Sequence, residues 1–158
     1  MSNLENLSEK DMGQISTYQS GIAQASAHRV INRVVSDFLV RYDLTAMQWF
    51  IIGYINDAGS VGLTIGDICQ VIDTTLPYTT NTINLLESKG IVNKRVHSKD
   101  SRIKIVTLDP THKAMVEEIE EGLRDELRKT LYATDRISRD ELQTYIHVLY
   151  KIIAADKQ

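Results

Sequence analysis

The sequence predicts a mostly α-helical protein with one small β-hairpin, and three observations lead to this fold class. Apolar residues recur at helical spacing over most of the 158-residue chain. Helix starts carry Thr or Ser followed three residues later by Gln, Asp or Glu, a pattern that caps a first turn. Residues 91–96 and 103–108 instead alternate around a polar tip, which predicts a β-hairpin.

The composition limits the class of protein. With 42% hydrophobic and 25% charged residues, the chain is typical of a soluble globular domain. No apolar run approaches the roughly 18 residues of a membrane span, and residues 1–6 lack the basic and apolar regions of a signal peptide. One cysteine cannot form an intramolecular disulfide. We therefore expect a cytoplasmic protein that does not bind membranes.

The first half of the chain predicts three helices. The first runs from about Ile15 to Tyr42, with one face formed by Ala27, Ile31, Val34, Val35, Phe38 and Tyr42. A capping box of Thr45 and Gln48 opens the second. Its inward residues are predicted to be Met47, Phe50, Ile51, Tyr54 and Ile55. Thr64 starts a short third helix, with a buried side of Ile65, Ile68, Cys69 and Ile72.

A fourth helix is predicted from the turn 73–75 to Lys89, with Gly90 as the residue that ends it. Its buried stripe is Thr79, Thr82, Ile83 and Leu86. The opposite face carries short, uncharged side chains where an ordinary solvent-facing helix carries Glu and Lys. This face is formed by Pro77, Tyr78, Thr80, Asn81 and Asn84. Its composition favours a contact surface over a plain polar surface helix.

The hairpin is basic although the whole chain has a net charge of −3. Residues 89–104 contain one acidic residue, Asp100, and six basic ones: Lys89, Lys94, Arg95, Lys99, Arg102 and Lys104. A local positive patch on an acidic protein indicates a focused contact, for which a phosphate backbone is the best match.

Two more helices are predicted after the hairpin. One begins at Asp109-Pro110 and continues to about Thr130; the other opens at a capping box of Ser138 and Glu141. The final helix has an apolar stripe wider than one chain needs, which a monomer would leave exposed. The stripe is Leu142, Tyr145, Ile146, Leu149, Ile152 and Ile153.

A helix–turn–helix followed at once by a two-stranded hairpin is a winged helix. Further motifs are Leu44-Thr45-x-x-Gln48, Leu63-Thr64-x-x-Asp67-Ile68, Leu85-Leu86-Glu87-x-Lys89-Gly90-Ile91-Val92-x-Lys94-Arg95, and Asp100-Ser101-Arg102 followed by Val106-x-Leu108. On these motifs the sequence resembles the MarR family of transcription regulators, from about residue 25 to the end.

The resemblance implies a homodimer on double-stranded DNA, with residues 44–109 as the winged helix-turn-helix DNA-binding lobe. Residues 1–43 and 110–158 would form the flanking helical dimerisation region. The two-fold symmetry would be matched by a pseudo-palindromic site with half-sites about one helical turn (~34 Å) apart. The implied DNA-binding residues are Thr64, Thr75, Pro77, Tyr78, Thr80, Asn81, Asn84, Lys94, Arg95, Lys99, Ser101 and Arg102.

The resemblance implies a role for each of these residues according to its position. The uncharged face of the fourth helix would enter the major groove, where an Asn amide suits adenine. Arg102 would enter the minor groove, and Asp100 would shape the wing because a carboxylate facing phosphate is repulsive. Lys94, Arg95 and Lys99 would set affinity and salt dependence. Backbone N–H groups near Thr64 and Thr75, which open helices, could meet phosphates.

A repressor of this kind would be controlled by a small molecule bound between the dimerisation helices and the lobe, through a population shift. Candidate lining residues are Tyr42, Met47, Trp49, Phe50 and Tyr54, all of which could equally be core. The alternative function is a winged-helix protein-interaction module that has lost DNA binding, favoured by the uncharged helix face and the acidic balance. Arg102 and the basic wing favour the DNA-binding regulator, because an interaction module would have no reason to keep them.

Other chemistry finds little support in the sequence. The histidines at 28, 97, 112 and 147 are scattered without metal-ligand spacing, so we expect neither a metal nor a cofactor. Cys69 could sense redox state, but its place on an apolar stripe favours core packing. No catalytic motif occurs, and we do not expect an enzyme.

Overall fold

The structure, a computed structural model, describes residues 12–157 and consists of helices around a small antiparallel sheet. The fold class predicted from the sequence is confirmed. Within the described residues, the elements are, in order, η2 (Met12–Gln14), α2 (Thr17–Leu39), η3 (Val40–Tyr42), α3 (Ala46–Asp57), β1 (Leu63–Thr64), α4 (Ile65–Val71), α5 (Leu76–Ser88), β2 (Val92–Val96), β3 (Lys104–Leu108), η4 (Pro110–His112), α6 (Lys113–Thr130) and α7 (Arg139–Asp156), where η denotes a 3-10 helix.

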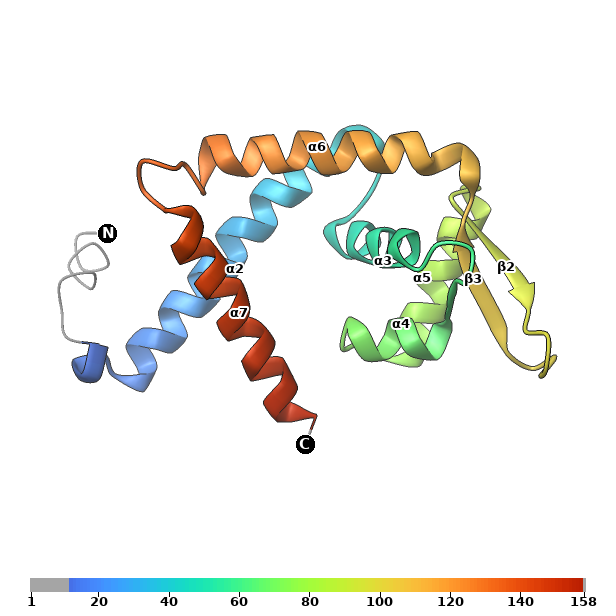
Figure 1. The fold of residues 1–158 in the computed structure, drawn as a ribbon, viewed down its shortest axis with the longest axis horizontal. Coiled ribbons are helices and arrows are strands. Elements are labelled where there is room, and N and C mark those ends of the chain that lie inside the picture. Colours follow the sequence, from blue (N-terminus) through green and yellow to red (C-terminus); the bar gives the residue numbers. More distant parts are fainter. Residues whose placement is uncertain (1–11, 158) are drawn as a thin grey trace.

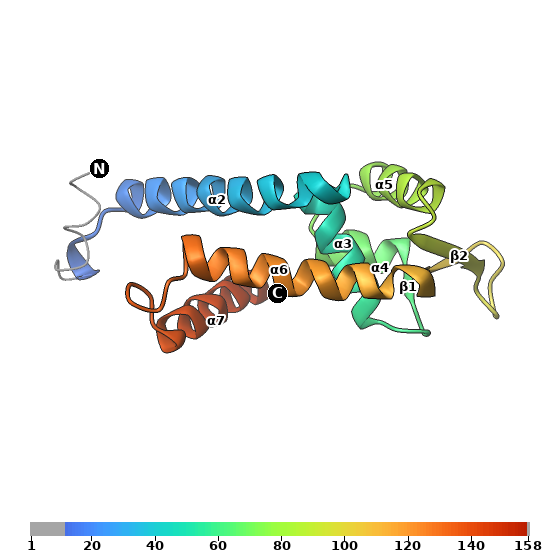
Figure 2. The ribbon, with the colours of Figure 1, turned by 90° about the horizontal axis from the view of Figure 1, so that it is seen from above.

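The long helix α6 runs from the lobe to the loop that leads into α7 (Figure 1). A lobe of α3, α4, α5 and the sheet lies at one end, and α7 descends from α6 at the other. Helix α2 packs against α6; the two overlap in direction when seen from above (Figure 2) but diverge toward the N-terminal end of α2 in Figure 1. Within residues 12–157, no helix has both the length and the apolarity that crossing a membrane requires.

Among the helices of residues 12–157, four begin with a complete capping box, in which the N-cap hydroxyl and the side chain three residues later each accept a backbone N–H. The boxes predicted at Thr45 and Ser138 are confirmed, and Thr64 also starts its helix with one. A further box, Ser16 with Gln19, opens α2 and was not predicted. At the other end of α5, Gly90 has a φ of +74°, the left-handed conformation expected of the residue that ends a helix.

The sheet has three strands in the order β1-β3-β2, all antiparallel. The predicted hairpin is confirmed, with Lys94 opposite Val106 and Arg95 opposite Ile105. The sequence did not predict β1, because two residues are too short to form a pattern. Its pairing of Leu63 with Val106 places the start of α4 beside the wing.

The core lies where α3, α5 and the sheet meet α2 and α6, and α3 contributes most to it. The inward face predicted for α3 was partly wrong: Phe50 is 48% exposed and Tyr54 36%, whereas Trp49 and Ile52 are buried with Ile51 and Ile55. Apolar residues surround this helix almost completely, so spacing alone does not select the buried side.

The buried faces predicted for the other helices agree with the structure, with smaller differences. The buried stripe of α5 consists of the four residues predicted. In α4 only Ile68 is fully buried, and the other three predicted residues are half-buried. On α2, Ala27 is exposed. The helix expected from Asp109 starts with the 3-10 turn η4, which Asp109 caps, and becomes α-helical at Lys113.

Candidate nucleic-acid interface

Helix α5 carries the candidate DNA-reading face, and its threonines explain why polar residues can line both sides. The buried hydroxyls of Thr79 and Thr82 donate to the carbonyl oxygens of Thr75 and Tyr78, one turn earlier. Among the described residues, no buried side-chain polar atom lacks a partner. The inward threonines are therefore satisfied within the helix and leave the outer face available.

The outer face of α5 exposes Pro77, Tyr78, Asn81 and Asn84, and half-exposes Thr80. It also exposes two apolar side chains that the sequence reasoning missed. They are Leu76 and Leu85, and Leu85 lies seven residues after Tyr78, on the same side of the helix. That spacing could have identified Leu85. An exposed leucine here can contact a thymine methyl group.

Lys94 lies against α5 rather than projecting into solvent. Its Nζ is 2.8 Å from a carboxylate oxygen of Glu87 and donates to Oδ1 of Asn84 at 2.7 Å. Lys94 therefore joins the wing strand β2 to the reading helix.

Two further cations of the basic patch are also engaged within the chain. Arg95 donates to the carbonyl oxygens of Ser60 and Val61, which holds the loop before β1. Lys89 donates to the backbone carbonyl and carboxylate of Asp43, and this contact lowers the pKa of Asp43. These contacts fix α5 and the wing relative to the rest of the lobe.

The wing tip presents Arg102 and Lys99 to solvent. Oδ1 of Asp100 accepts from the backbone N–H of Arg102 at 2.9 Å and from its Nε at 3.4 Å. The N–H of Ile103 donates to the Asp100 carbonyl, which closes the turn. The side chain of Arg102 is nevertheless 92% exposed. The tip is thus shaped by Asp100 and leaves a guanidinium on its outside.

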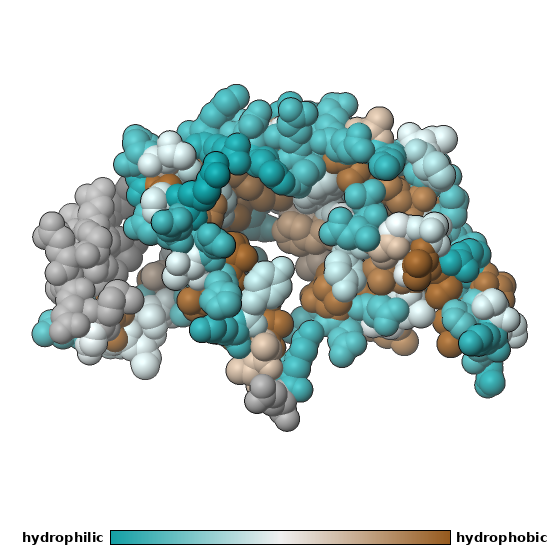
Figure 3. All heavy atoms as spheres, in the orientation of Figure 1, coloured by the Kyte–Doolittle hydropathy of each residue, from teal (hydrophilic) through white to brown (hydrophobic). Residues whose placement is uncertain are grey.

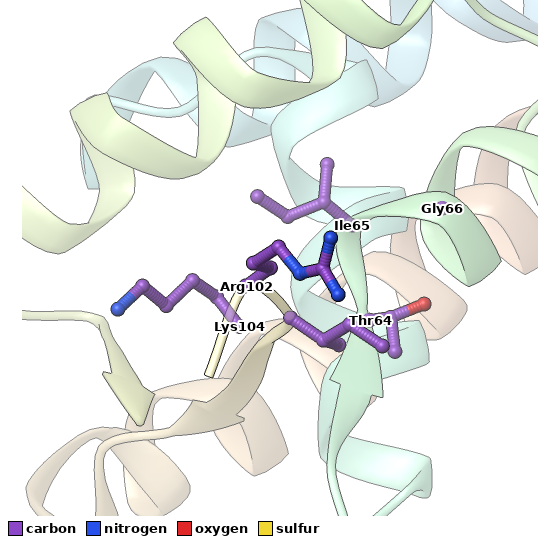
Figure 4. Close-up of a pocket in the computed structure, with 6 residues that line it drawn as sticks. Thr64, Ile65, Gly66, Arg102 and Lys104 are labelled. Carbon is purple, nitrogen blue, oxygen red and sulfur yellow. The ribbon is translucent and has the colours of Figure 1, made fainter. Parts of the chain in front are cut away.

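A shallow recess of about 350 Å³ separates the wing from the start of α4. In Figure 4 the Arg102 guanidinium points toward the segment 64–66, whereas the Lys104 amine points away. The Thr64 hydroxyl and N–H are both used in the capping box with Asp67. Thr64 therefore fixes the start of α4, and Arg102 supplies a positive charge to the recess.

A larger groove of about 570 Å³ lies between the lobe and the helices α2, α6 and α7. Figure 3 shows a hollow bordered by apolar atoms between α7 and the lobe. Of the predicted ligand residues, Trp49 and Phe50 line this groove, and Tyr42, Met47 and Tyr54 do not. Tyr42 instead donates to Glu118 at 2.7 Å, a bond that raises the pKa of Tyr42. The lining is Ile31, Val35, Trp49, Phe50, Glu120, Leu123, Arg124, Leu127, Arg128, Tyr132, Leu142 and Ile146.

Cys69, which the sequence placed in the core, has a local structural role. The Cys69 thiol is half-buried and donates to the carbonyl of Thr74 at 2.7 Å, across the turn between α4 and α5. Over residues 12–157, no three His, Cys, Asp or Glu side chains gather in a way that could hold a metal ion.

An exposed reading helix, followed by a wing with an outward arginine, defines a winged helix-turn-helix DNA-binding protein. The model of the MarR family matches residues 42–103, which cover the lobe from η3 to the end of the wing turn. The winged-helix lobe therefore matches the MarR family of DNA-binding transcription regulators.

Solved structures resemble the chain over nearly its whole length. Staphylococcus aureus MepR in its DNA-binding conformation is 26% identical, with a TM-score of 0.70, and covers 89% of this chain and 98% of its own. The S. aureus MepR–DNA complex is 24% identical, with a TM-score of 0.71, over 90% and 99%. CouR from Rhodococcus jostii RHA1 bound to p-coumaroyl-CoA is 13% identical, with a TM-score of 0.75, over 89% and 95%. Comparison with curated protein sequences finds no match.

Proposed function

We propose that this protein is a homodimeric repressor that binds a pseudo-palindromic DNA sequence and is released by a small molecule. The observation that carries the proposal is the pairing of an uncharged, exposed α5 face with a wing whose Arg102 side chain is 92% exposed. The MepR structure of the same fold holds DNA, which supports this use of the lobe.

The residues divide into three groups by their role in binding DNA. The exposed face of α5 enters the major groove with Pro77, Tyr78, Thr80, Asn81 and Asn84, which read base edges. At the wing, Arg102 and Ser101 meet the minor groove and Lys99 meets phosphate. Thr75, Thr64 and Arg95 hold these elements in register and bring backbone N–H groups near phosphates.

Dimerisation is supported by α7, whose apolar side chains stay partly exposed to solvent within residues 12–157. Tyr145, Ile146, Leu149, Ile152 and Ile153 are all exposed, from 37% to 59%. Such a row of large apolar side chains on one helix marks an interaction surface. A second copy, packed through α7 and α2, covers it and places the two reading helices on one side.

The groove between lobe and helices is the proposed effector site. It is large enough for a small organic molecule, and its lining is mainly apolar but includes the charged residues Glu120, Arg124 and Arg128. CouR, which has the same fold, binds p-coumaroyl-CoA. A ligand that favours a spacing of reading helices unsuited to DNA lowers DNA affinity by shifting the population.

The test is binding of the purified protein to DNA flanking its own gene, titrated against salt and random competitor DNA. Competitor-resistant binding at a two-fold symmetric sequence is the expected result. Weak binding that disappears equally on all DNA would favour the alternative, a winged-helix protein-interaction module. The exposed Leu76 and Leu85 would then belong to a protein interface.

Arg102→Ala tests the wing directly. We expect weaker operator binding and an unchanged dimer in sedimentation. Within residues 12–157 the guanidinium is hydrogen-bonded only to Asp100, so its loss should not disturb the fold. Equal operator affinity of the variant and the wild type would refute the assigned role.

A further inference from the structure

The contact between Lys94 and Asn84 crosses from the wing strand to the reading helix. Lys94 Nζ lies 2.7 Å from Oδ1 of Asn84 and 2.8 Å from the Glu87 carboxylate, and the Lys94 side chain is only 22% exposed. Asn84 itself remains exposed on the face of α5 that would enter the major groove. One end of its amide is therefore held while the other is open to a ligand.

The chemistry of lysine fixes which end is held. An ammonium group has three donors and no acceptor, so only the carbonyl oxygen of the Asn84 amide can face it. The amide nitrogen, with its two N–H groups, must then point away from Lys94. The usual ambiguity between the two ends of an asparagine amide does not apply here.

We propose that Lys94 is a positioning residue that turns the Asn84 carbonyl oxygen toward the wing and presents its amide N–H groups to DNA. The proposal rests on the proposed function, and it replaces the phosphate role that the sequence predicted for Lys94. Pairing with adenine needs both ends of the amide, one accepting from N6 and one donating to N7. Because Lys94 turns Oδ1 toward the wing, this two-ended pairing is lost, and the amide N–H groups favour a base edge that presents only acceptors, such as N7 and O6 of guanine or O4 of thymine.

Asn81 provides an internal comparison on the same helix. It is exposed one turn before Asn84, and its side chain makes no hydrogen bond to any residue of the described chain. Both ends of its amide are available, so Asn81 is suited to adenine. Two asparagines three residues apart thus have different base preferences because a lysine holds one of them.

The Glu87 contact separates this role from simple phosphate binding. A lysine paired with a carboxylate at 2.8 Å has its charge neutralised locally, whereas Lys99 at the wing tip has no ion pair within the described residues. Removal of a phosphate contact lowers the slope of log affinity against log salt by about 0.9. Loss of Lys94 is therefore expected to change base choice and leave this slope unchanged.

The experiment selects binding sites from randomised DNA with four proteins: wild type, Asn84→Ala, Lys94→Met and Lys99→Met. Asn84→Ala identifies the base pair that Asn84 reads, as the one position whose preference is lost in both half-sites. At that position we expect wild type to favour guanine or thymine, and Lys94→Met to shift the preference toward adenine by about tenfold. Lys99→Met is the matched control, which keeps every base preference and loses about one phosphate contact from the salt slope.

An adenine preference of the wild type at this position would overturn the proposal. So would a Lys94→Met variant that keeps the wild-type base preference or loses a phosphate contact from its salt slope. NMR of the DNA-free protein tests the hydrogen bond separately: the Asn84 side-chain amide signals should move in Lys94→Met and not in Lys99→Met. If Lys94→Met does not fold, the Lys94 ammonium signal in Asn84→Ala tests the same bond. If the wild type binds DNA without sequence preference while the Asn84 amide signals still move in Lys94→Met, the proposed function is refuted and the hydrogen bond is confirmed.

Discussion

Asp109 connects the base of the wing to the helix that follows it. Its Oδ1 accepts from the N–H and the hydroxyl of Thr111, its Oδ2 accepts from Asn93 on β2, and its own N–H donates to the Ile91 carbonyl. These donors lower the pKa of the Asp109 carboxyl from 3.8 to about 2, and the Thr111 hydroxyl has the largest effect. The ionised form is therefore favoured in the folded protein.

The lowered pKa predicts a dependence of stability on pH. Because the folded pKa lies below the unfolded one, the stabilisation is complete above about pH 4 and is lost as the pH falls toward 2. Asp109→Asn should be less stable than wild type near neutral pH, and the gap should narrow between about pH 4 and pH 2. Urea unfolding across this range measures both.

Asp135→Asn is the matched control for Asp109. The Asp135 side chain is exposed and makes no hydrogen bond within residues 12–157, so its removal should leave the pH profile unchanged. A gap between Asp109→Asn and wild type that stays constant from neutral pH to pH 2 would contradict the assignment.

At the residue scale the sequence identified which side chains face outward and missed how they contact one another. The outer face of α5 followed from helical spacing. The bonds of Lys94 to Asn84 and of Arg95 to Ser60 join residues 10 and 35 positions apart, and they depend on how β2 lies against its neighbours. A basic patch in a sequence therefore does not tell which cations are free.

Strand β1 is the element that depends most on its surroundings. It holds two residues and is reached through Gly62, which has a φ of +71°. A Cβ at this position would lie 2.6 Å from the Val106 carbonyl oxygen and 2.6 Å from Ile105 Cγ2. The close approach of the chain to β3 therefore requires glycine.

Gly62→Ala should destabilise the fold by the strain of the left-handed backbone, about 1 kcal/mol, plus about 1–3 kcal/mol for the clash with β3. Gly59→Ala is the matched control, because Gly59 also has a positive φ of +57° but no atom within 4 Å of a Cβ. Thermal or urea unfolding of both variants gives the comparison. Equal losses in the two would mean that the contact with β3 is relaxed at no free-energy cost.

Elements whose signal is local were predictable, and elements formed by pairing were not. The capping boxes at Thr45 and Ser138 and the end at Gly90 each lie within a few residues of the helix that they limit, and all are present. By contrast, β1 exists only through its pairing with β3. The buried side of α3 was predicted in part, since its neighbours α6 and β3 decide which apolar face is covered.

On the scale of the whole molecule, α7 presents an apolar stripe that stays exposed among residues 12–157, and we propose that a second copy covers it. Ile152→Asp places a charge in the proposed dimer interface, where it would be buried without a partner. We expect dimer affinity to fall by about 100-fold or more, and operator binding to fall with it. Sedimentation measures the first and a DNA titration the second.

Thr144→Asp is the control for this prediction, since Thr144 is exposed on the face of α7 opposite the stripe. It should remain a dimer and bind DNA as wild type does. A monomeric wild type, or a fully dimeric Ile152→Asp, would exclude α7 as the interface.

The uninterrupted helix α6 has a mechanical consequence. Its 18 residues make a rod of about 27 Å, with the lobe at one end and the turn into α7 at the other. A rod of that length amplifies angle into distance: a tilt of about 10° carries the far end through about 5 Å, more than the rise of about 3.4 Å between base pairs. In the proposed function, a ligand bound beside α6 would therefore need to tilt it only slightly to move the reading helix by more than one base-pair step along DNA.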